Sequence, residues 1–301
     1  MSETSEVALR PSRLPAAVRA MRPRQWIKNV LVITAPLAAG RLFEVKVITA
    51  VALAFVAFCL VSATVYLIND VRDVNEDRLH PRKRLRPIAA GELRPAAALV
   101  LAAITGVAGF AVGFATSPAL GITLAIYVVV QICYSVFLKH LPVVDLAIVA
   151  SGFLLRAIAG GAAADIALSQ WFLLVAAFGS LFMVAGKRYS ELKAIGADVG
   201  TRRSLERYTE SYLRFVWMAA AVLVLISYSL WAFESRFTTQ LLDVPWTAIS
   251  IAPFTLGLLQ YALEVDAGMA GEPEEVVLHD HVLQGLGLAW LVLISVAVFP
   301  W

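Results

Sequence analysis

The sequence predicts an all-α, polytopic membrane protein whose nine transmembrane helices form one bundle. Three observations lead to this fold class: an excess of apolar residues, their grouping into windows of helical length, and a one-sided distribution of cations. Of the 301 residues, 60% are hydrophobic and 16% are charged, whereas soluble domains are roughly 45–50% apolar and about 25% charged. The mean hydropathy is +0.77. This composition excludes a soluble globular enzyme, a disordered chain and a DNA-binding module, so no nucleic-acid partner is expected.

Nine apolar windows, each near the length that crosses a bilayer as a helix, cover most of the chain. They lie at about 26–42, 46–68, 95–116, 118–138, 142–164, 168–186, 212–233, 245–263 and 282–300. The first window is short, and Pro36 is expected to interrupt its helix. The fifth carries Asp145, Arg156 and several glycines, which are unusual on a helix surrounded by lipid. Residues 1–21 are expected to form a cytoplasmic N-terminal segment, and residues 22–301 a single membrane-embedded domain.

The cations are distributed unevenly between these windows. With the N-terminus inside, the cytoplasmic segments hold 21 of the 25 Lys and Arg residues, the outside segments hold three, and Arg156 lies within a span. Positive residues collect on the cytoplasmic side of membrane proteins. The pattern therefore predicts a multi-pass protein of the plasma (inner) membrane with its N-terminus inside. The two long loops, 70–94 and 187–214, then face the cytoplasm.

The second window runs into a cluster of oxygen-bearing side chains, N-D-V-R-D-V-N-E-D at 69–77. On a helix Asn69, Asp73 and Asp77 share one face, with Asp70 and Glu76 beside it. Carboxylates this close repel one another unless a cation lies between them, and Mg²⁺ binds one or two carboxylates together with water and phosphate oxygens. We therefore predict a Mg²⁺-diphosphate site with Asn69, Asp70, Asp73 and Asp77 as metal ligands. The alternative is a solvated helix end neutralised by neighbouring arginines.

A basic run, H-P-R-K-R-L-R-P at 80–87, follows the acidic residues. We predict that Arg72, Arg82, Lys83 and Arg86 bind substrate through the phosphate oxygens that the metal leaves free. Arginine suits bidentate contacts to phosphate, and lysine acts as a point charge. The alternative for the run alone is membrane topology or binding to anionic lipid. Its position beside the acidic residues favours a substrate role.

The run at 69–77 resembles the first aspartate-rich motif of the UbiA-type intramembrane prenyltransferase superfamily, N-D-x-x-D-x-x-x-D. The next residues, R-K-x-x-R-P-x-x-x-G at 82–91, are similar to the family's continuation, and the likeness extends from about Arg22 to the C-terminus. The resemblance implies a nine-helix bundle with a polar cavity facing the cytoplasm. It also implies Mg²⁺-assisted release of diphosphate from a donor, and a side opening for a long isoprenoid. Residues 22–301 would then be a catalytic domain, with Asp73 and Asp77 catalytic.

The chain departs from the family at the end of the sixth window. A second aspartate-rich motif is expected there, but the sequence reads G-K-R-Y-S-E-L-K at 186–193 and holds no Asp. Tyr189 and Lys193 occupy the i, i+4 spacing of the expected pair of aspartates. Beside Lys187 and Arg188 a second Mg²⁺ is disfavoured and a further anion is favoured. We therefore predict that these four residues bind a donor that carries another phosphate besides its diphosphate.

Phosphoribosyl pyrophosphate carries its phosphates in that way, and a branch of the superfamily uses it as donor. Three local patterns are similar to that branch: R-P-x-Q-W-x-K-N at 22–29, Y-S-x-x-L-K-H at 134–140 leading to Asp145, and L-R-x-x-x-G at 155–160. The resemblance implies Mg²⁺-dependent transfer of 5-phosphoribose to decaprenyl (polyprenyl) phosphate. Pyrophosphate is released, and the product serves the synthesis of a precursor of cell-wall arabinan.

Five further polar residues lie in or beside the apolar windows. Arg156 is predicted to be a catalytic phosphate ligand lining the cavity, and the alternative is a buried pair with an acid. Lys28 and Lys139 are predicted to bind substrate, with snorkelling to the interface as the alternative. Asp145 either caps a helix or binds ribose hydroxyls. Tyr134 either hydrogen-bonds donor oxygens or is an ordinary interfacial aromatic residue.

Two other functions are less consistent with the sequence. A prenyl diphosphate donor that alkylates an aromatic ring keeps the fold, but the missing second pair of aspartates argues against it. A transporter or channel for an anionic solute would place polar residues through the full membrane depth, whereas here they gather at one face. The residues leave open whether the chain works alone or as a homo-oligomer.

Overall fold

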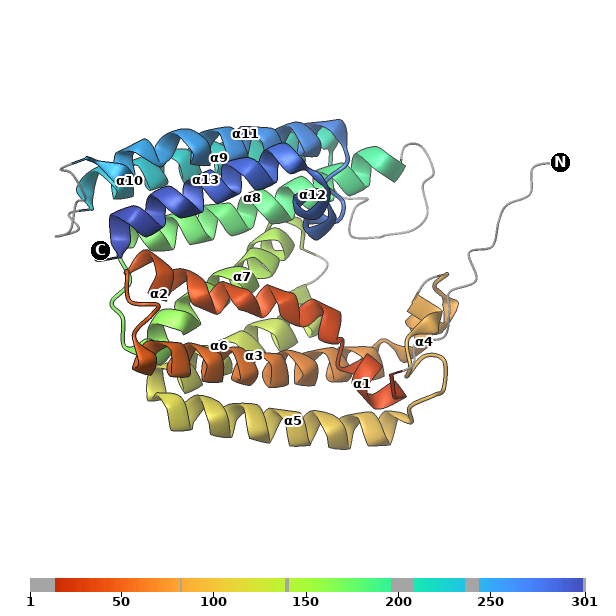
Figure 1. The fold of residues 1–301 in the computed structure, drawn as a ribbon. Helices are drawn as coiled ribbons and strands as arrows, with labels where there is room; N and C mark the ends of the chain where they lie inside the picture. Colours follow the sequence, from red (N-terminus) through yellow and green to blue (C-terminus); the bar gives the residue numbers. More distant parts are fainter. Residues whose placement is uncertain (1–13, 82, 139–140, 196–207, 236–243, 300–301) are drawn as a thin grey trace.

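The computed structural model describes residues 14–81, 83–138, 141–195, 208–235 and 244–299, and every regular element in these ranges is a helix (Figure 1). Eight helical segments are long and apolar enough to cross a membrane. They are α3 (Val45–Arg72), α5 (Pro95–Thr116), α6 (Pro118–Cys133) with its π-helical continuation η3 (Tyr134–Leu138), α7 (Pro142–Ala164), α8 (Gln170–Ile195), α9 (Glu210–Glu234), α10 (Trp246–Ile249) with α11 (Ile251–Ala267), and α13 (His281–Val298). The predicted all-α, multi-pass membrane fold is confirmed.

The first predicted span is not a regular α-helix, which is why it is absent from the eight. It consists of a 3₁₀ helix, η1 (Pro23–Ile33), followed by the short helix α2 (Thr34–Ala38). Because α2 begins at Thr34, Pro36 falls within its first turn, where a missing N–H has no helical partner to lose. The proline that was expected to interrupt this window is thus accommodated by a change of helix type before it.

The η1–α2 segment still runs from one end of the bundle to the other. Arg22, just before η1, contacts Asp70 near the C-terminal end of α3. Just after α2, the backbone of Gly40 lies against Val298 at the end of α13. Figure 1 shows the segment beside α3, with the C-terminus near the end that Gly40 occupies. The chain therefore traverses the bundle here as well, although η1–α2 does not qualify as a regular span.

The helices are arranged in two groups (Figure 1). The segments up to α7 lie on one side, and α8, α9, α11 and α13 lie on the other. Helix α3 is the most enclosed span, with 61% of its apolar window buried. Its side chains Phe58 and Val61 form a core with Leu124 and Tyr127 of α6. This enclosed helix carries the acidic motif at its C-terminal end, so the site is attached to the most buried of the eight spans.

Four short elements complete the fold. They are α1 (Ala16–Ala20), α4 (Val74–Leu79), η2 (Lys83–Leu85) and α12 (Pro273–His279). Together with η3 and the C-terminal end of α8 they lie near the end of the bundle that holds the acidic motif. We call this end the polar end, defined by Asp70, Asp77, Asp145 and Arg188.

A hollow of about 570 Å³ lies between α3 and α5. Its lining is almost wholly apolar and includes Ile68, Ala103, Gly106 and Phe110, with Thr64 as the polar exception. The Thr64 hydroxyl is already used by the protein, since it lies 2.9 Å from Thr105 Oγ1. The cytoplasm-facing polar cavity that the resemblance implies stays a prediction.

Candidate active site

The acidic motif lies where α3 passes into α4. Helix α3 ends at Arg72, and Asp73 joins it to α4 with φ −89° and ψ 11°. Hydrogen bonds from Asp73 N to Asn69 O (2.9 Å) and from Asp77 N to Asp73 O (2.8 Å) keep the helical succession. Asp70 and Asp77 are each 2% exposed, whereas Asp73 is half-buried. Asp70 and Asp77 are therefore more buried than Asp73. They are seven residues apart, so they share a helix face.

Cations surround these two carboxylates. The Arg86 guanidinium bridges them, since its Nη1 donates to Asp70 Oδ1 (3.1 Å) and to Asp77 Oδ2 (2.6 Å). Lys83 Nζ lies 3.8 Å from Asp77 Oδ1, and Arg22 forms a second ion pair with Asp70. The structure thus brings two predicted substrate ligands, Arg86 and Lys83, to the acidic motif, and it adds Arg22, which the sequence analysis did not select.

The pair Asp70 and Asp77 suits a divalent cation that also binds phosphate. Both carboxylates reach one guanidinium nitrogen, so their oxygens already converge on a single positive centre. Mg²⁺ needs only one or two carboxylates when phosphate oxygens complete its shell. The described residues contain no group of three or more His, Cys, Asp or Glu side chains that could hold a metal ion. Asn69 Oδ1 accepts a hydrogen bond from Ser135 Oγ (2.7 Å), and the metal-ligand roles of Asn69 and Asp73 stay predictions.

A second polar cluster surrounds Asp145, which is 1% exposed in the first turn of α7. Tyr134 Oη donates to Asp145 Oδ1 at 2.7 Å, and Arg188 Nη2 lies 3.0 Å from Oδ1 and 2.8 Å from Oδ2. No side chain caps α7, so the helix-cap alternative for Asp145 is wrong. Tyr208 donates to the carbonyl of Pro142 nearby, and burial, reinforced by the charge of Asp145, raises its pKa.

Ser135 connects the two clusters. Its hydroxyl donates to Asn69 of α3, and its carbonyl and hydroxyl accept from Arg72 Nη1, the hydroxyl at 3.2 Å. The preceding residue, Tyr134, reaches Asp145 on α7. Arg72, a predicted substrate ligand, is exposed, and these hydrogen bonds hold it against η3. A series of hydrogen bonds thus links Asn69 of the acidic motif, through the adjacent residues Ser135 and Tyr134, to Asp145 and Arg188.

Arg156 lies deeper in the bundle, 5% exposed. Its Nε donates to Asn29 Oδ1 (2.7 Å), Nη1 to the carbonyl of Gly152 (2.6 Å) and Nη2 to Tyr127 Oη (3.0 Å). Within the described part of the chain, no carboxylate forms an ion pair with Arg156. The alternative, a buried pair with an acid, is therefore not found among these residues. Its guanidinium also lies 5.6 Å from the ring centre of Phe58. The phosphate-ligand role of Arg156 stays a prediction.

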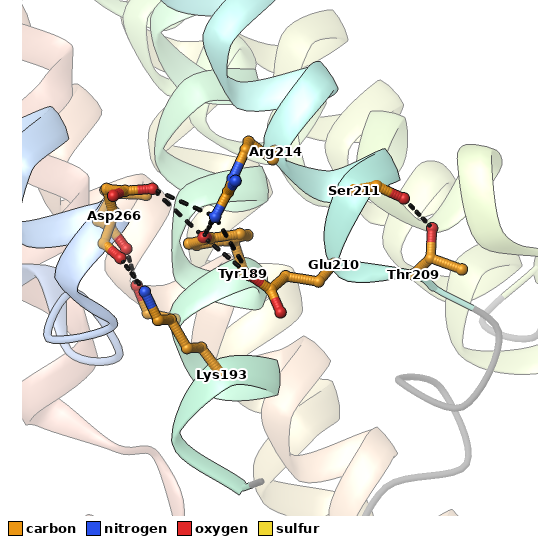
Figure 2. Close-up of polar contacts among 9 residues, drawn as sticks. Tyr189, Lys193, Thr209, Glu210, Ser211, Arg214 and Asp266 are labelled. Atoms are coloured by element: carbon orange, nitrogen blue, oxygen red, sulfur yellow. Dashed lines mark hydrogen bonds and ion pairs between the residues drawn. The ribbon is translucent and has the colours of Figure 1, made fainter.

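Tyr189 and Lys193 contact residues of α9 and α11, as Figure 2 shows. Tyr189 is fully buried, and its hydroxyl lies 2.6 Å from Arg214 Nη2, 3.2 Å from Glu210 Oε1 and 3.3 Å from Asp266 Oδ1. Lys193 Nζ donates to the carbonyl of Asp266 at 2.6 Å. These five residues, which we call the Tyr189 cluster, tie α8 to α9 and α11. Both residues lie on α8, so their i, i+4 spacing places them on one face, but the spacing does not reveal which neighbouring helices that face meets. Their role in binding substrate stays a prediction.

The remaining predicted ligands are dispersed. Lys187 lies 3.9 Å from Glu191 on its own helix, and Lys28 is half-buried on η1. Arg82 and Lys139 lie outside the described residues. Sequence reasoning missed Arg22, Asn29, Ser135 and the partners of Tyr189. The first three lie inside patterns that were singled out, at 22–29 and 134–140, so their neighbourhood was found but their individual roles were not.

The fold and the polar end together define a multi-pass membrane protein with charged residues of both signs gathered at one end of a helical bundle. The chain belongs to the UbiA prenyltransferase family, whose model matches residues 30–277. It is accordingly a membrane transferase, as its relatives also indicate. It is 49% identical to the decaprenyl-phosphate phosphoribosyltransferase of Mycolicibacterium smegmatis, over 99% of this chain and 98% of that protein. It is 50% identical to the enzyme of that name from Mycobacterium tuberculosis, over 96% of both chains.

Solved structures show the same fold at low sequence identity. A UbiA homolog from Archaeoglobus fulgidus bound to GPP and Mg²⁺ aligns with a TM-score of 0.67 at 16% identity, covering 94% of this chain and 98% of that one. The same homolog bound to Cd²⁺ gives a TM-score of 0.66, with the same identity and coverage. These likenesses establish the fold.

Proposed function

We propose that the chain transfers the 5-phosphoribosyl group of phosphoribosyl pyrophosphate to decaprenyl phosphate or another polyprenyl phosphate. The observation that carries the proposal is the identity of about half of all residues, over nearly the full chain, to proteins named for that reaction. The site supports it in two ways. Convergent carboxylates suit a metal-bound diphosphate. Arg188, next to the position where the family's second pair of aspartates is expected, pairs with the buried Asp145.

The reaction is a displacement at the anomeric carbon of ribose. An oxygen of the polyprenyl phosphate attacks C1, the bond from C1 to the diphosphate oxygen breaks, and pyrophosphate leaves with that electron pair. The sugar acquires oxocarbenium character on the way, as in other glycosyl transfers. The attacking phosphate is already ionised near pH 7, so no strong general base is needed. Positioning and electrostatic stabilisation therefore carry the rate.

The residues of the acidic motif and its neighbours act on the leaving group. Asp70 and Asp77, with Asn69 and Asp73 beside them, would hold Mg²⁺, which when bound neutralises charge on the departing diphosphate. Arg86 and Lys83 hold its remaining oxygens. In the second cluster, Asp145 and Tyr134 orient ribose hydroxyls, and Arg188 binds the other phosphate. Four residues at 187–193 are predicted to bind this phosphate. Arg188 suits that role best, because it lies beside Asp145 in the second cluster.

We also propose that the polar end faces the cytoplasm of the plasma membrane, because the cations concentrate there. A water-soluble donor then enters from the cytoplasm, and the lipid acceptor comes from the bilayer. The product would be a polyprenyl-phosphate-linked phosphoribose, the class of compound from which a cell-wall arabinan is built.

The test is a transfer assay in membranes with radiolabelled donor and polyprenyl phosphate. Asp77→Ala is expected to lower Mg²⁺-dependent transfer by about 100-fold or more, as expected for loss of a group that stabilises developing charge. Glu76→Ala is the matched control, because Glu76 is exposed on the same short helix, and it should retain activity. Full transfer by Asp77→Ala would refute the metal assignment. Release of pyrophosphate from a prenyl diphosphate, and none from phosphoribosyl pyrophosphate, would refute phosphoribosyl pyrophosphate as the donor.

A further inference from the structure

Arg22 occupies an unusual position for an arginine. It links α1 to η1 with φ 55° and ψ 61°, in the left-handed region that side-chain-bearing residues rarely adopt. The next residue is Pro23, which itself restricts the backbone before it. Such strain persists only where surrounding contacts hold it, and it concentrates at functional sites. The contacts here are the ion pair with Asp70 and the ring of Tyr66, 5.0 Å from the guanidinium carbon.

The charges around Asp70 and Asp77 explain what Arg22 does there. Two buried carboxylates face Arg22, Arg86 and Lys83, so the motif already has its counter-ions without a metal. Arg86 touches both carboxylates, whereas Arg22 touches only Asp70 and comes from a different part of the chain. A divalent cation that binds Asp70 must share that carboxylate with Arg22 or displace it. Arg22 is the cation that can leave while Arg86 keeps the two carboxylates together.

We propose that Arg22 is a tethered counter-ion, which neutralises Asp70 while the site is empty and moves to the donor's diphosphate when that group arrives with its divalent cation. The inference rests on the proposed function, because it needs a metal-bound diphosphate. A guanidinium can form two parallel hydrogen bonds to phosphate as readily as to carboxylate. This movement exchanges the single contact with Asp70 Oδ1 for a contact with phosphate that can have two parallel hydrogen bonds. Arg22 then becomes a positioning residue for the leaving group.

The position of Arg22 is set by the docking of η1. Asn29, two turns further along, accepts a hydrogen bond from Arg156, and Val32 packs its carbonyl directly against Gly160 of α7. These contacts fix η1 against the bundle, so the start of η1 cannot drift from Asp70. The Arg22 side chain is 27% exposed, which leaves it room to change partner.

The test measures ligand binding by the full-length protein in detergent, read as thermal stabilisation and not as activity. The probes are MgCl₂ alone and MgCl₂ with inorganic pyrophosphate. Arg22→Gln removes the competing charge, so it should bind Mg²⁺ alone more tightly than the wild type, by about tenfold, because one charge-assisted contact is relieved. The same variant should bind pyrophosphate in the presence of Mg²⁺ more weakly, by about the same factor.

Two further variants make the outcome specific. Arg22→Lys keeps the charge but not the bidentate geometry, so Mg²⁺ binding should match the wild type while pyrophosphate binding weakens. Arg19→Gln is the matched control, since Arg19 pairs with Glu92 and not with Asp70, and it should change neither. Unchanged or weaker Mg²⁺ binding by Arg22→Gln, or unchanged pyrophosphate binding by that variant, would overturn the proposed movement of Arg22 from Asp70 to the diphosphate. A wild-type protein that binds no pyrophosphate with Mg²⁺ would instead overturn the proposed function.

Discussion

Arg156 is a full positive charge inside the bundle whose described partners are neutral. Buried charges are normally paired, because removing an ion from water costs several kcal/mol even after relaxation. Here the cost is offset by hydrogen bonds to an amide, a carbonyl and a phenol, and by aromatic faces 4.9–5.9 Å away. A positive charge in a low-dielectric interior projects a field toward the nearest aqueous surface. Substrates that carry several phosphates are attracted by such a field.

Asp280 is a different kind of charged residue, an N-cap whose role depends on pH. Its carboxylate accepts hydrogen bonds from the N–H groups of Val282 (2.8 Å) and Leu283 (3.0 Å) and from Gln260 (2.8 Å). The hydrogen bond from Leu283, followed by that from Gln260, lowers the pKa of Asp280. A lowered pKa means that the charged form stabilises the fold above the unfolded pKa of about 3.9, and that this contribution is lost as pH falls below it.

We therefore expect Asp280→Ala to lower the Tm of the purified protein near neutral pH. The difference from the wild type should shrink as pH falls below about 4, because the wild-type carboxylate is then protonated. Asp280→Asn is the control, since asparagine also caps helices but does not titrate in this range. A wild-type-to-alanine difference that stays constant down to pH 3 would contradict the assignment.

The first crossing of the bundle depends on a close approach between two elements. A Cβ atom on Gly160 would lie 1.8 Å from the carbonyl oxygen of Val32, so η1 can lie against α7 only where α7 has no side chain. The obstacle is backbone, which cannot rotate away as a flexible side chain can. The close packing of η1 against α7 therefore depends on the absence of a side chain at Gly160.

Gly160→Ala is expected to destabilise the protein by about 1–3 kcal/mol, as overpacking of a tight contact does. Gly106→Ala on α5 is the matched control, because the added methyl would meet only Thr64 side-chain atoms at 3.4 Å. Alanine also favours a helix over glycine by about 0.5–1 kcal/mol. Denaturation followed by circular dichroism should separate the two variants. Equal stability would show that η1 is not held against α7 at this point.

Across the whole molecule, the two ends of the bundle differ in charge. The polar end carries the acidic motif, the second cluster and the Tyr189 cluster. At the other end the described cations include Arg41, which pairs with Glu44. This asymmetry is what predicts the orientation, because translocation disfavours loops rich in Lys and Arg.

Single cysteines at the two ends would measure the orientation. Asn75→Cys places a thiol at an exposed position of the polar end, and Ala167→Cys places one at an exposed position of the other end. In intact cells, a membrane-impermeant maleimide should label Ala167→Cys and leave Asn75→Cys unlabelled. The pattern should reverse in inverted vesicles. The wild type is the background control, because Cys59 is buried and Cys133 is half-buried. Labelling of Asn75→Cys in intact cells would invert the topology.

Much of the fold was predictable because hydrophobic length is a property of the sequence. The windows gave the eight regular spans, and the spacing of carboxylates located the acidic motif. The sequence could not show that Asp70 is more buried than Asp73, or that Tyr189 faces α9 and α11. Periodicity defines which residues share a face, but only tertiary packing decides what that face meets. The packing of η1 was hidden for the same reason, since the sequence does not show that Val32 contacts Gly160 of α7.

The π-helical turn of η3 has a consequence for insertions and deletions. A π turn holds one residue more than an α turn, so side chains on either side of it are rotated relative to a regular helix. In this turn Tyr134 reaches α7 while the adjacent Ser135 reaches α3. Removing one residue between 134 and 138 would restore regular α geometry and swing one of these two side chains off its partner. The two contacts therefore constrain the number of residues in this turn, and natural variation here should be by substitution alone.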